Sequence, residues 1–435
     1  MDNLLDPLDQ TMFDLGRATG VTGLIQAVWV YNRAVDIEGL RKFHGHLQRG
    51  RLSRRIERSP LPFGRHRWVA PNGSPTLEVV SSARPREEFD AWLTEQARIP
   101  LDCERGPGWH LAVLPFTDGG AGVSLLVPHS ITDGLGLFEA LADAALGRDD
   151  PIRWPAAGSR RRWQAVREDA RQTARDARAI GRGVAATVRA ARRARDTAPP
   201  LATNAAAPAG TDDPIMLPTA TVFVDAREWD ARAHALGGTS NALLVGLAAR
   251  LAELRGRLTA DGMVAMRIPV SDRTVGDRRG NAVSNVDVRV DPAAATTDLR
   301  EIRAAVKQAL TRHREVPDDE RVMLSLVPLL PQGLLRVTGS ATSVIATNLG
   351  MADPAVTRAD GRDADYFAAR LLYQGVSTAL MHRLGGLQVL PSGRAHGQVF
   401  VSAIAYQPGG PNSNDGLRHD LSIVLKDFSL TGTHL

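Results

Sequence analysis

The feature that most constrains the fold of this chain is a change of character near its middle. Residues 1–150 and 215–435 both alternate short apolar runs, which predict strands, with longer stretches of helical spacing. Residues 151–214 between them are basic and then rich in Ala and Pro. At 435 residues the chain exceeds what one hydrophobic core usually holds, so about two domains are expected. The sequence therefore predicts two α/β halves, each a mixed sheet with flanking helices, and a connector.

The first half, residues 1–150, contains a strand, two helices, a hairpin and a closing helix in the predicted order. The hairpin is the firmest of these, because the turn sequence Thr-Asp-Gly-Gly at 117–120 separates two apolar runs. The expected elements lie at residues 24–31, 37–49, 89–96, 111–115 with 123–127, and 135–146.

The second half, residues 215–435, repeats this mixture without any short-period repeat. Its clearest helix is 240–256, where five leucines occupy one set of helical positions. A further helix is expected at 299–314, and strands are expected at 220–224, 265–270, 283–290, 343–347, 387–390 and 398–406.

The connector over 151–214 divides into a basic helix and a linker. Many of its arginines are three or four residues apart, which places them along a helix surface, and a narrow apolar stripe that includes Trp163, Val166 and Ala170 runs between them. Residues 197–214 have no apolar period and predict a linker. Two interpretations of the helix stay open: a solvated connector packed across both halves, or a surface for an anionic membrane or an acidic partner.

Composition excludes several classes of protein. The net charge of +5 comes mostly from arginine, but no zinc-finger spacing, RNA-binding sheet motif or basic region with heptads is present, so nucleic acid is not an expected partner. The single cysteine, Cys103, permits neither an intramolecular disulfide nor a multi-cysteine metal site, and no metal is expected. No apolar run approaches the ~20 residues of a membrane span, and residues 1–9 do not read as a signal peptide. A cytoplasmic protein is expected.

The run His129-Ser-Ile-Thr-Asp133-Gly134 carries the strongest chemical signal. It follows the second strand of the hairpin and precedes the closing helix. Because an imidazole titrates near neutrality, His129 could take a proton from a substrate hydroxyl or amine without a large pKa shift. The chain has no Gly-x-Ser-x-Gly elbow, no phosphate-binding Walker loop and no Gly-x-Gly-x-x-Gly after a strand, so serine hydrolases and the usual nucleotide sites are not indicated.

This run resembles the His-x3-Asp-Gly motif of the chloramphenicol-acetyltransferase-like acyltransferases, a superfamily that includes nonribosomal peptide condensation domains and plant BAHD enzymes. Over nearly the whole chain, the bacterial wax ester synthase/diacylglycerol acyltransferases are the most similar subgroup. Further ordered matches to the motifs of that subgroup are Pro7-Leu8-Asp9, Pro100-Leu101-Asp102 through Pro107-Gly108-Trp109, Asn241, Pro269-Val270-Ser271-Asp272-Arg273, Gly280-Asn281 and Thr347-Asn348.

The resemblance implies two subdomains with an active-site channel between them, and direct acyl transfer without an acyl-enzyme. His129 would act as the general base. Asp133 would cap the following helix and pair with an arginine, Arg273 or Arg267. Gly134 would allow a tight turn or a close approach that a Cβ would block.

The resemblance also implies the reactants and leaves several roles open. The acyl donor would be a thioester, either acyl-CoA or an acyl carrier protein, and the acceptor a small or lipophilic hydroxyl compound; no further cofactor is expected. Asn348 and Ser343 are candidates for contacts with the oxyanion or substrate. Asn241 is either a helix N-cap or a direct contributor to the site. The enzyme would be cytoplasmic, with the basic helix as a candidate peripheral contact to the inner membrane face.

Departures from the subgroup pattern keep alternatives open. Pro128 stands where a first histidine is usual, Ala242 where an aspartate follows the asparagine, and Gly108 within Pro-Leu-Trp. Transfer from acyl-CoA to a lipophilic alcohol is the expected function. The alternatives are a carrier-protein-dependent or condensation-type enzyme of a secondary-metabolite or glycolipid pathway, and a non-catalytic scaffold with the same fold.

Overall fold

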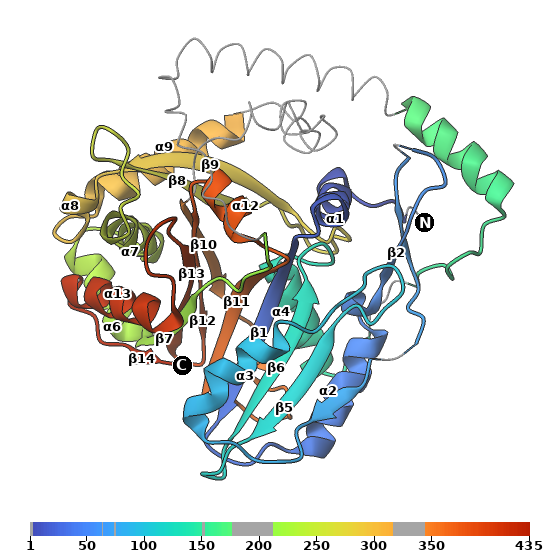
Figure 1. Cartoon of the computed structure of the whole chain (residues 1–435), viewed down its shortest axis with the longest axis horizontal. Helices are drawn as coiled ribbons and strands as arrows, with labels where there is room; N and C mark the ends of the chain where they lie inside the picture. The colour runs from blue at the N-terminus through green and yellow to red at the C-terminus, as the bar shows by residue number, and fades with distance from the viewer. Residues whose placement is uncertain (1–2, 63, 74, 150–152, 176–211, 316–343) are drawn as a thin grey trace.

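Two large twisted sheets with flanking helices, and a small two-stranded sheet, make up the described part of the chain in the computed structural model (Figure 1). The structure describes residues 3–62, 64–73, 75–149, 153–175, 212–315 and 344–435. The predicted α/β class is confirmed: the five-stranded sheet comes mainly from the first half of the chain and the seven-stranded sheet from the second.

The first sheet has the order β11-β1-β6-β5-β4, and only β4 and β5 pair in parallel. Strand β1, between β11 and β6, is buried on both faces, since its alternate side chains point to opposite sides of the sheet and almost all of them are buried. Trp29 packs with helices α2 and α4, whereas Val28 packs with α3. The bounds are β1 Thr22–Tyr31, β4 Leu77–Val79, β5 His110–Pro115, β6 Ala121–Pro128, β11 Tyr366–Gln374, α2 Ile37–Arg49, α3 Phe89–Gln96 and α4 Gly134–Ala145.

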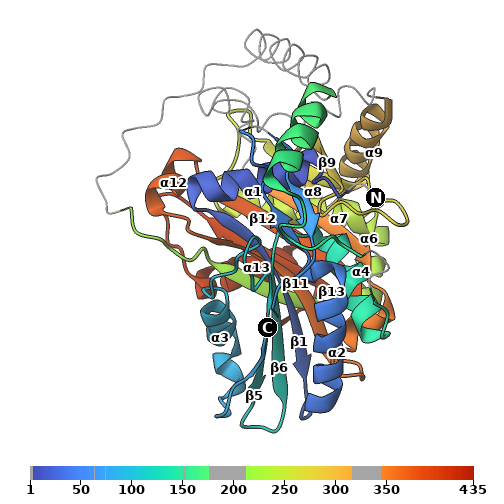
Figure 2. The same cartoon turned by 90° about the vertical axis from the view of Figure 1, so that its right-hand side faces the viewer.

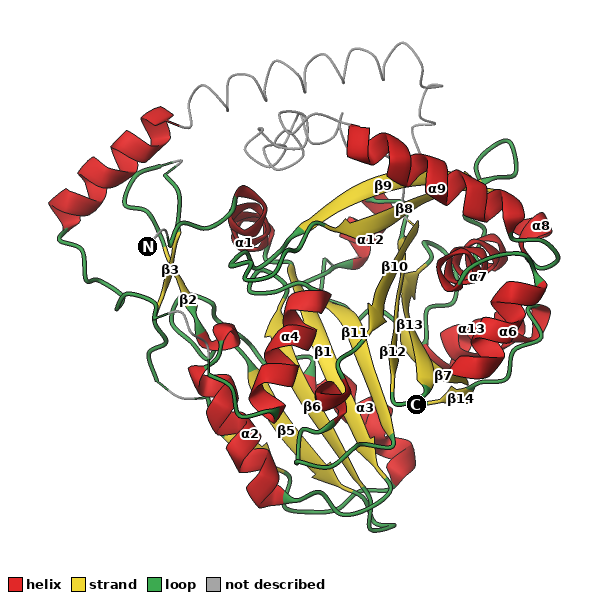
Figure 3. Cartoon of the chain, turned by 180° about the vertical axis from the view of Figure 1, so that it is seen from behind, coloured by secondary structure: helices red, strands yellow, loops and turns green. Residues whose placement is uncertain are grey.

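Side and rear views show how helices cover this sheet (Figures 2 and 3). Helix α2 turns Leu40, Phe43 and Leu47 to the core, and Asp36 caps its first turn by accepting from two backbone N–H groups. Helix α1, Pro7–Thr19, crosses one end of the sheet. The short elements nearby are η1 Arg51–Ser53, β2 Arg55–Glu57, β3 Arg67–Val69 and η2 Arg86–Glu88.

The second sheet has the order β14-β7-β13-β12-β10-β8-β9, with β10 parallel to both of its neighbours. Burial alternates along β9, whose buried face packs against Ile302 and Val306 of α9. The bounds are β7 Thr219–Asp225, β8 Val264–Ser271, β9 Val283–Val290, β10 Val344–Met351, β12 Leu387–Ala395, β13 Gln398–Tyr406, β14 Thr433–His434, α6 Ala226–Ala235, α7 Ser240–Leu254, α8 Pro292–Ala295, α9 Arg300–Glu315, η4 Pro354–Thr357, α12 Thr378–Arg383 and α13 Asn414–Asp427.

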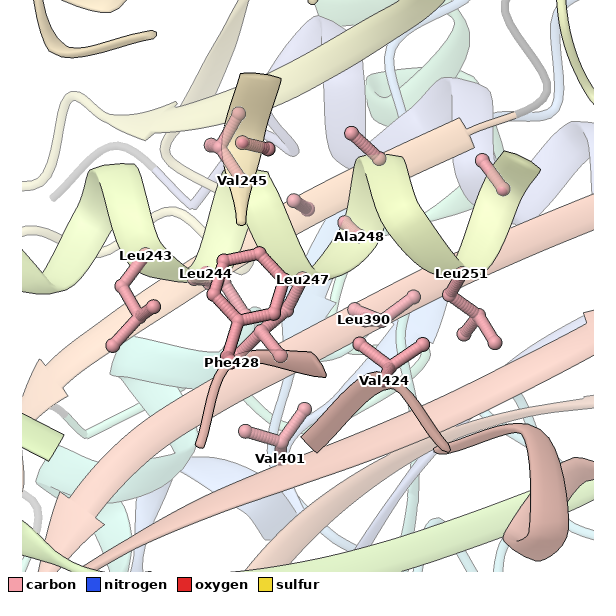
Figure 4. Packing of buried hydrophobic residues seen from close by; sticks show 14 of the residues in the cluster. Leu243, Leu244, Val245, Leu247, Ala248, Leu251, Leu390, Val401, Val424 and Phe428 are labelled. Carbon is pink, nitrogen blue, oxygen red and sulfur yellow. The ribbon is translucent and has the colours of Figure 1, made fainter. Parts of the chain in front are cut away.

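Helix α7 is the centre of the second core. It is apolar almost all round and packs against β10 of the sheet and against helices α8, α9 and α13, with Phe428 from the segment after α13 beside it (Figure 4). Leu247 and Leu251 are fully buried, and Phe428 packs beside Gly246, where the helix has no side chain.

Strand β11 belongs to the second half by sequence and to the first sheet by pairing. Its residues pair antiparallel with β1 from Thr22 to Val30. Residues 366–374 thus complete the sheet of the first half, although they lie within 215–435. Phe367 on this strand contacts Trp29 of the first sheet and Phe400 of the second, with ring centroids 5.4 and 6.2 Å apart.

The basic helix is described from residue 162 to 175, and the rest of the connector, 176–211, lies outside the described residues. Its buried residues are Ala165 and Asp169. The predicted apolar stripe is not the buried face of the helix, since Trp163 in that stripe is 81% exposed. Asp169 accepts from the Ser59 hydroxyl at 2.6 Å and forms ion pairs with Arg67 and Arg160. A buried carboxylate rather than an apolar seam holds this helix on the first half.

Candidate active site

His129 lies where β6 ends and the chain turns toward α4. Its backbone N–H donates to the carbonyl of Gly23 at 2.8 Å, so the pairing of β6 with β1 extends to the histidine itself. The side chain is half-buried, and its Cβ lies 3.6 Å from where a Cβ on Gly23 would stand. The strand end therefore fixes the position of the imidazole.

Asn281 determines which imidazole nitrogen carries the proton. Its Nδ2 donates to the His129 carbonyl at 2.9 Å and to the Asp9 carboxylate at 3.0 Å, so both amide hydrogens face acceptors. Its Oδ1 then faces Nδ1 of His129 at 2.9 Å. Because an amide oxygen only accepts, a neutral His129 carries its proton on Nδ1, and Nε2 keeps its lone pair.

Asp9 of α1 holds the segment that contains Asn281. Its carboxylate is fully buried and accepts from the backbone N–H groups of Gly280 and Asn281, at 2.8 and 2.6 Å. Burial raises the pKa of Asp9 to about 6, against the opposing effects of the Arg54 charge and of the hydrogen bond from Asn281. The carboxylate is therefore mainly ionised at neutral pH.

Asp133 makes two kinds of contact at the start of α4. It caps the helix by accepting from the N–H of Gly136 at 2.7 Å. It also pairs with Arg273 at 2.8 Å and accepts from the N–H of Ala282. Arg267, the other expected partner, pairs instead with Asp287. The ion pair ties the histidine turn to the segment between β8 and β9.

Two glycines allow these segments to approach each other. A Cβ on Gly134 would lie 2.5 Å from Cδ2 of Leu349 on β10, so close packing is the expected reason for a glycine there. A Cβ on Gly280 would lie 2.8 Å from the Ile131 carbonyl oxygen. The Gly280 carbonyl also accepts from the N–H of Asp133 at 2.9 Å.

Arg54 is a further buried residue of this region that sequence reasoning did not identify. Its guanidinium donates to the Ile131 carbonyl at 2.9 Å and to the Arg278 carbonyl at 2.6 Å. It stacks over Trp68, with Cζ 3.8 Å from the ring centroid. Arg54 thus joins the histidine turn to the β8–β9 segment, and only its three-dimensional neighbours indicate this.

Two of the remaining predicted site residues, Asn241 and Asn348, lie on α7 and β10. Asn348 Nδ2 donates to Asn241 Oδ1 at 2.9 Å, so these two residues contact each other. Asn241 is not an N-cap, because Thr239 precedes the first helical residue in an extended conformation and its hydroxyl accepts from Ala242. Ser343 lies outside the described residues.

The described residues include neither a cluster of metal-ligating side chains nor a membrane-spanning helix. No group of three or more His, Cys, Asp or Glu side chains there is arranged to hold a metal ion. Among those same residues, no helix has both the length and the apolar character needed to cross a bilayer.

Comparison with known proteins shows the fold. No protein-family model and no curated protein matches the chain. A wax ester synthase/diacylglycerol acyltransferase from Marinobacter aquaeolei VT8 is 15% identical, with a TM-score of 0.58 over 98% of each chain. The first condensation domain of the calcium-dependent antibiotic synthetase is 16% identical, with a TM-score of 0.55 over 98% of this chain and 95% of that one.

A third similar structure is the nonribosomal peptide synthetase FmoA3, 19% identical with a TM-score of 0.56. The match covers 98% of this chain but only 45% of FmoA3, so the chain spans less than half of that protein. The three similarities confirm the predicted chloramphenicol-acetyltransferase-like fold. At these identities they establish the fold, and the reaction is a separate question.

Proposed function

We propose that this protein is an acyltransferase that moves an acyl group from a thioester to a hydroxyl acceptor, with His129 as the general base. The observation that carries the proposal is the hydrogen bond between His129 Nδ1 and Asn281 Oδ1. It leaves Nε2 as the basic nitrogen of a half-buried imidazole at the end of β6. The shared fold with a wax ester synthase/diacylglycerol acyltransferase and with condensation domains supports the same class of reaction.

In the proposed reaction Nε2 removes the proton of the acceptor hydroxyl. The oxygen attacks the thioester carbonyl, the tetrahedral intermediate collapses, and the C–S bond breaks. The imidazolium then returns its proton to the thiolate, so an ester and a free thiol leave the enzyme. General base catalysis of this kind supplies roughly 10²–10⁴-fold, and holding both reactants together supplies more.

The oxyanion of the intermediate needs hydrogen-bond donors. Asn348 and Ser343 stay candidates for this role. The amide of Asn348 has two N–H groups, one of which donates to Asn241. Asn348→Ala should therefore lower kcat only if the second N–H faces the reacting carbonyl.

We take acyl-CoA and a lipophilic alcohol as the first pair of substrates to test. Release of free thiol from short, medium and long acyl-CoAs should be measured against a panel of alcohols and diacylglycerol. His129→Ala should lower kcat by roughly 10² or more while the protein stays folded. His46→Ala is the matched control, because His46 is also half-buried but lies on α2, where its Nδ1 is 3.1 Å from an Asp149 carboxylate oxygen.

The outcomes separate the alternatives. A His129→Ala variant that keeps more than a few per cent of the wild-type rate contradicts the general-base role. Thiol release from an acyl carrier protein, with none from any acyl-CoA, would favour the carrier-dependent enzyme. No histidine-dependent release from either donor would favour the non-catalytic scaffold.

We also propose that the basic helix, residues 162–175, contacts an anionic lipid surface. Asp169 fixes which face of this helix is covered, and Trp163, Arg167 and Arg171 are exposed at a spacing of four residues. An aromatic side chain beside cationic ones is typical of helices that lie at a membrane interface. An acidic protein partner is the alternative.

A further inference from the structure

Asp9 is a buried carboxylate 120 residues before His129 that the proposed reaction does not use directly. It belongs to α1, which precedes both sheets in the chain and crosses one end of the first sheet (Figure 2). All three of its hydrogen bonds go to Gly280 and Asn281, two from backbone N–H groups and one from the Asn281 amide. These hydrogen bonds are not part of the regular backbone pairing of any sheet or helix.

The bonds form one continuous path to the imidazole. The carboxylate holds Asn281 Nδ2 at 3.0 Å, and the same amide presents Oδ1 to His129 Nδ1 at 2.9 Å. A carboxylate accepts only, so it admits one orientation of the amide, with the nitrogen toward Asp9. That orientation places the oxygen on His129 and specifies the Nδ1–H tautomer.

We propose that Asp9 is a positioning residue which, through Asn281, holds His129 in the Nδ1–H tautomer with Nε2 free to act as a base. The structural part of this inference concerns the imidazole alone. Its catalytic consequence rests on the acyl-transfer function proposed above.

Other groups also hold the histidine turn against the β8–β9 segment, and the contribution of Asp9 must be distinguished from theirs. The His129 carbonyl also accepts from Asn281 Nδ2, and Arg54 braces the same two segments through the Ile131 and Arg278 carbonyls. The Arg273–Asp133 pair holds the segment from its other side. Asp9 is distinguished from these groups because it bonds both the backbone and the side chain of Asn281.

The direct test is the tautomer of His129, read from the ring nitrogen signals of protein labelled with ¹⁵N-histidine. The His129 signals are assigned by their absence in His129→Ala. The wild type should show the Nδ1–H form. In Asp9→Ala the Gly280–Asn281 segment loses three bonds, and His129 should shift toward the Nε2–H form or a mixture of both. Asp6→Asn is the matched control, since Asp6 caps α1 without bonding Asn281.

Kinetics form the second readout. If the acyl-transfer function is right, Asp9→Ala should lower kcat by roughly tenfold or more with little change in KM, because the base is misoriented and substrate contacts are kept. Asp6→Asn should keep the wild-type kcat. A chain with no transferase activity leaves the tautomer measurement valid, so failure of the proposed function and failure of this inference are distinguishable.

A wild-type ring pattern in folded Asp9→Ala overturns the proposal and makes Asp9 a purely structural residue. If Asp9→Ala does not fold, Asp9→Asn decides. Asparagine keeps the size of the side chain. Its own NH₂ group, however, must face at least one of the N–H groups of Gly280 and Asn281 that now donate to the Asp9 carboxylate. A wild-type ring pattern in this variant would show that the carboxylate is not required.

Discussion

At the scale of single residues, the position of the imidazole depends on groups from three separate parts of the chain. His129 leaves β6, Asn281 and Arg273 come from the segment between β8 and β9, and Asp9 comes from α1. Asn281 thus determines which ring nitrogen of His129 carries the proton, and Gly23 fixes the position of the His129 backbone. General bases with fixed tautomers are oriented by such neighbouring hydrogen bonds.

The Asp133–Arg273 pair offers a prediction about stability. Its side chains are 5% and 4% exposed, so removing one partner leaves a buried charge. Asp133→Ala should lower the free energy of unfolding by about 3–5 kcal/mol, with the lost helix cap as part of this cost. Denaturant unfolding checks this.

The control for this prediction lies on adjacent strands. Asp287 pairs with Arg267, and their side chains are 56% and 32% exposed. Asp287→Ala should therefore cost only about 0–1 kcal/mol. A fully stable but inactive Asp133→Ala would instead point to direct use of Asp133 in the reaction.

The sequence indicated the site only in part. His129, Asp133 and Gly134 form one short run, so local reasoning could find them, and Arg273 was one of two arginines expected to pair with Asp133. Asn281 and Asp9 were visible only as matches to a family pattern, because their contact spans 272 residues. Nothing local marks Arg54, whose burial is a property of the folded chain.

At the scale of elements, the basic helix gives a prediction that separates its two interpretations. Replacing Arg167, Arg171 and Arg175 with glutamine should weaken binding to phosphatidylglycerol vesicles, because each basic residue near an anionic surface contributes about 1 kcal/mol. Trp163→Ser should weaken it further. Vesicle co-sedimentation at low and high salt measures both effects.

A matched triple replacement controls for net charge. Arg303, Arg312 and Arg314 are exposed on α9, and their replacement with glutamine removes the same charge from another helix. This variant should bind vesicles as the wild type does. Equal losses in both triples would indicate general charge attraction, and no loss in either would leave the helix as a connector.

The elements themselves were predictable where their pattern was strong. Helix α2 and strands β9 and β13 have the predicted bounds, because α2 has a clear apolar face and the strands are rich in β-branched or alternating residues. Helix α1 was missed although Asp6, Pro7 and Gly20 mark its ends. Strand β11 was missed because its four consecutive buried residues, 367–370, remove the alternation that identifies a strand.

At the scale of the whole molecule, the two halves are joined by a strand and by a shared core. Because β11 completes the first sheet, the first half has no complete sheet without residues 366–374. Phe223 of β7 and Phe400 of β13 also lie in the same cluster as Trp29 and the helices of the first half. Such interlocking predicts that both halves unfold together.

Phe367 is the residue with which to test this cooperativity. It is 4% exposed and contacts Trp29, Phe138 and Phe400. Phe367→Ala should lower the free energy of unfolding by about 3–5 kcal/mol, as is usual for a buried phenylalanine, within a single transition. Far-ultraviolet circular dichroism and tryptophan fluorescence should report the same midpoint for this variant.

Phe428→Ala is the comparison, because Phe428 is fully buried but packs only within the core of the second half. If the molecule is one cooperative unit, both variants shift one common transition by similar amounts. If the halves are independent, Phe428→Ala would split the transition in two and leave the early-sequence tryptophans, Trp29, Trp68, Trp92 and Trp109, at the wild-type midpoint. The joining of the sheets through β11 favours the first outcome, since losing the second core also removes the strand that pairs with β1.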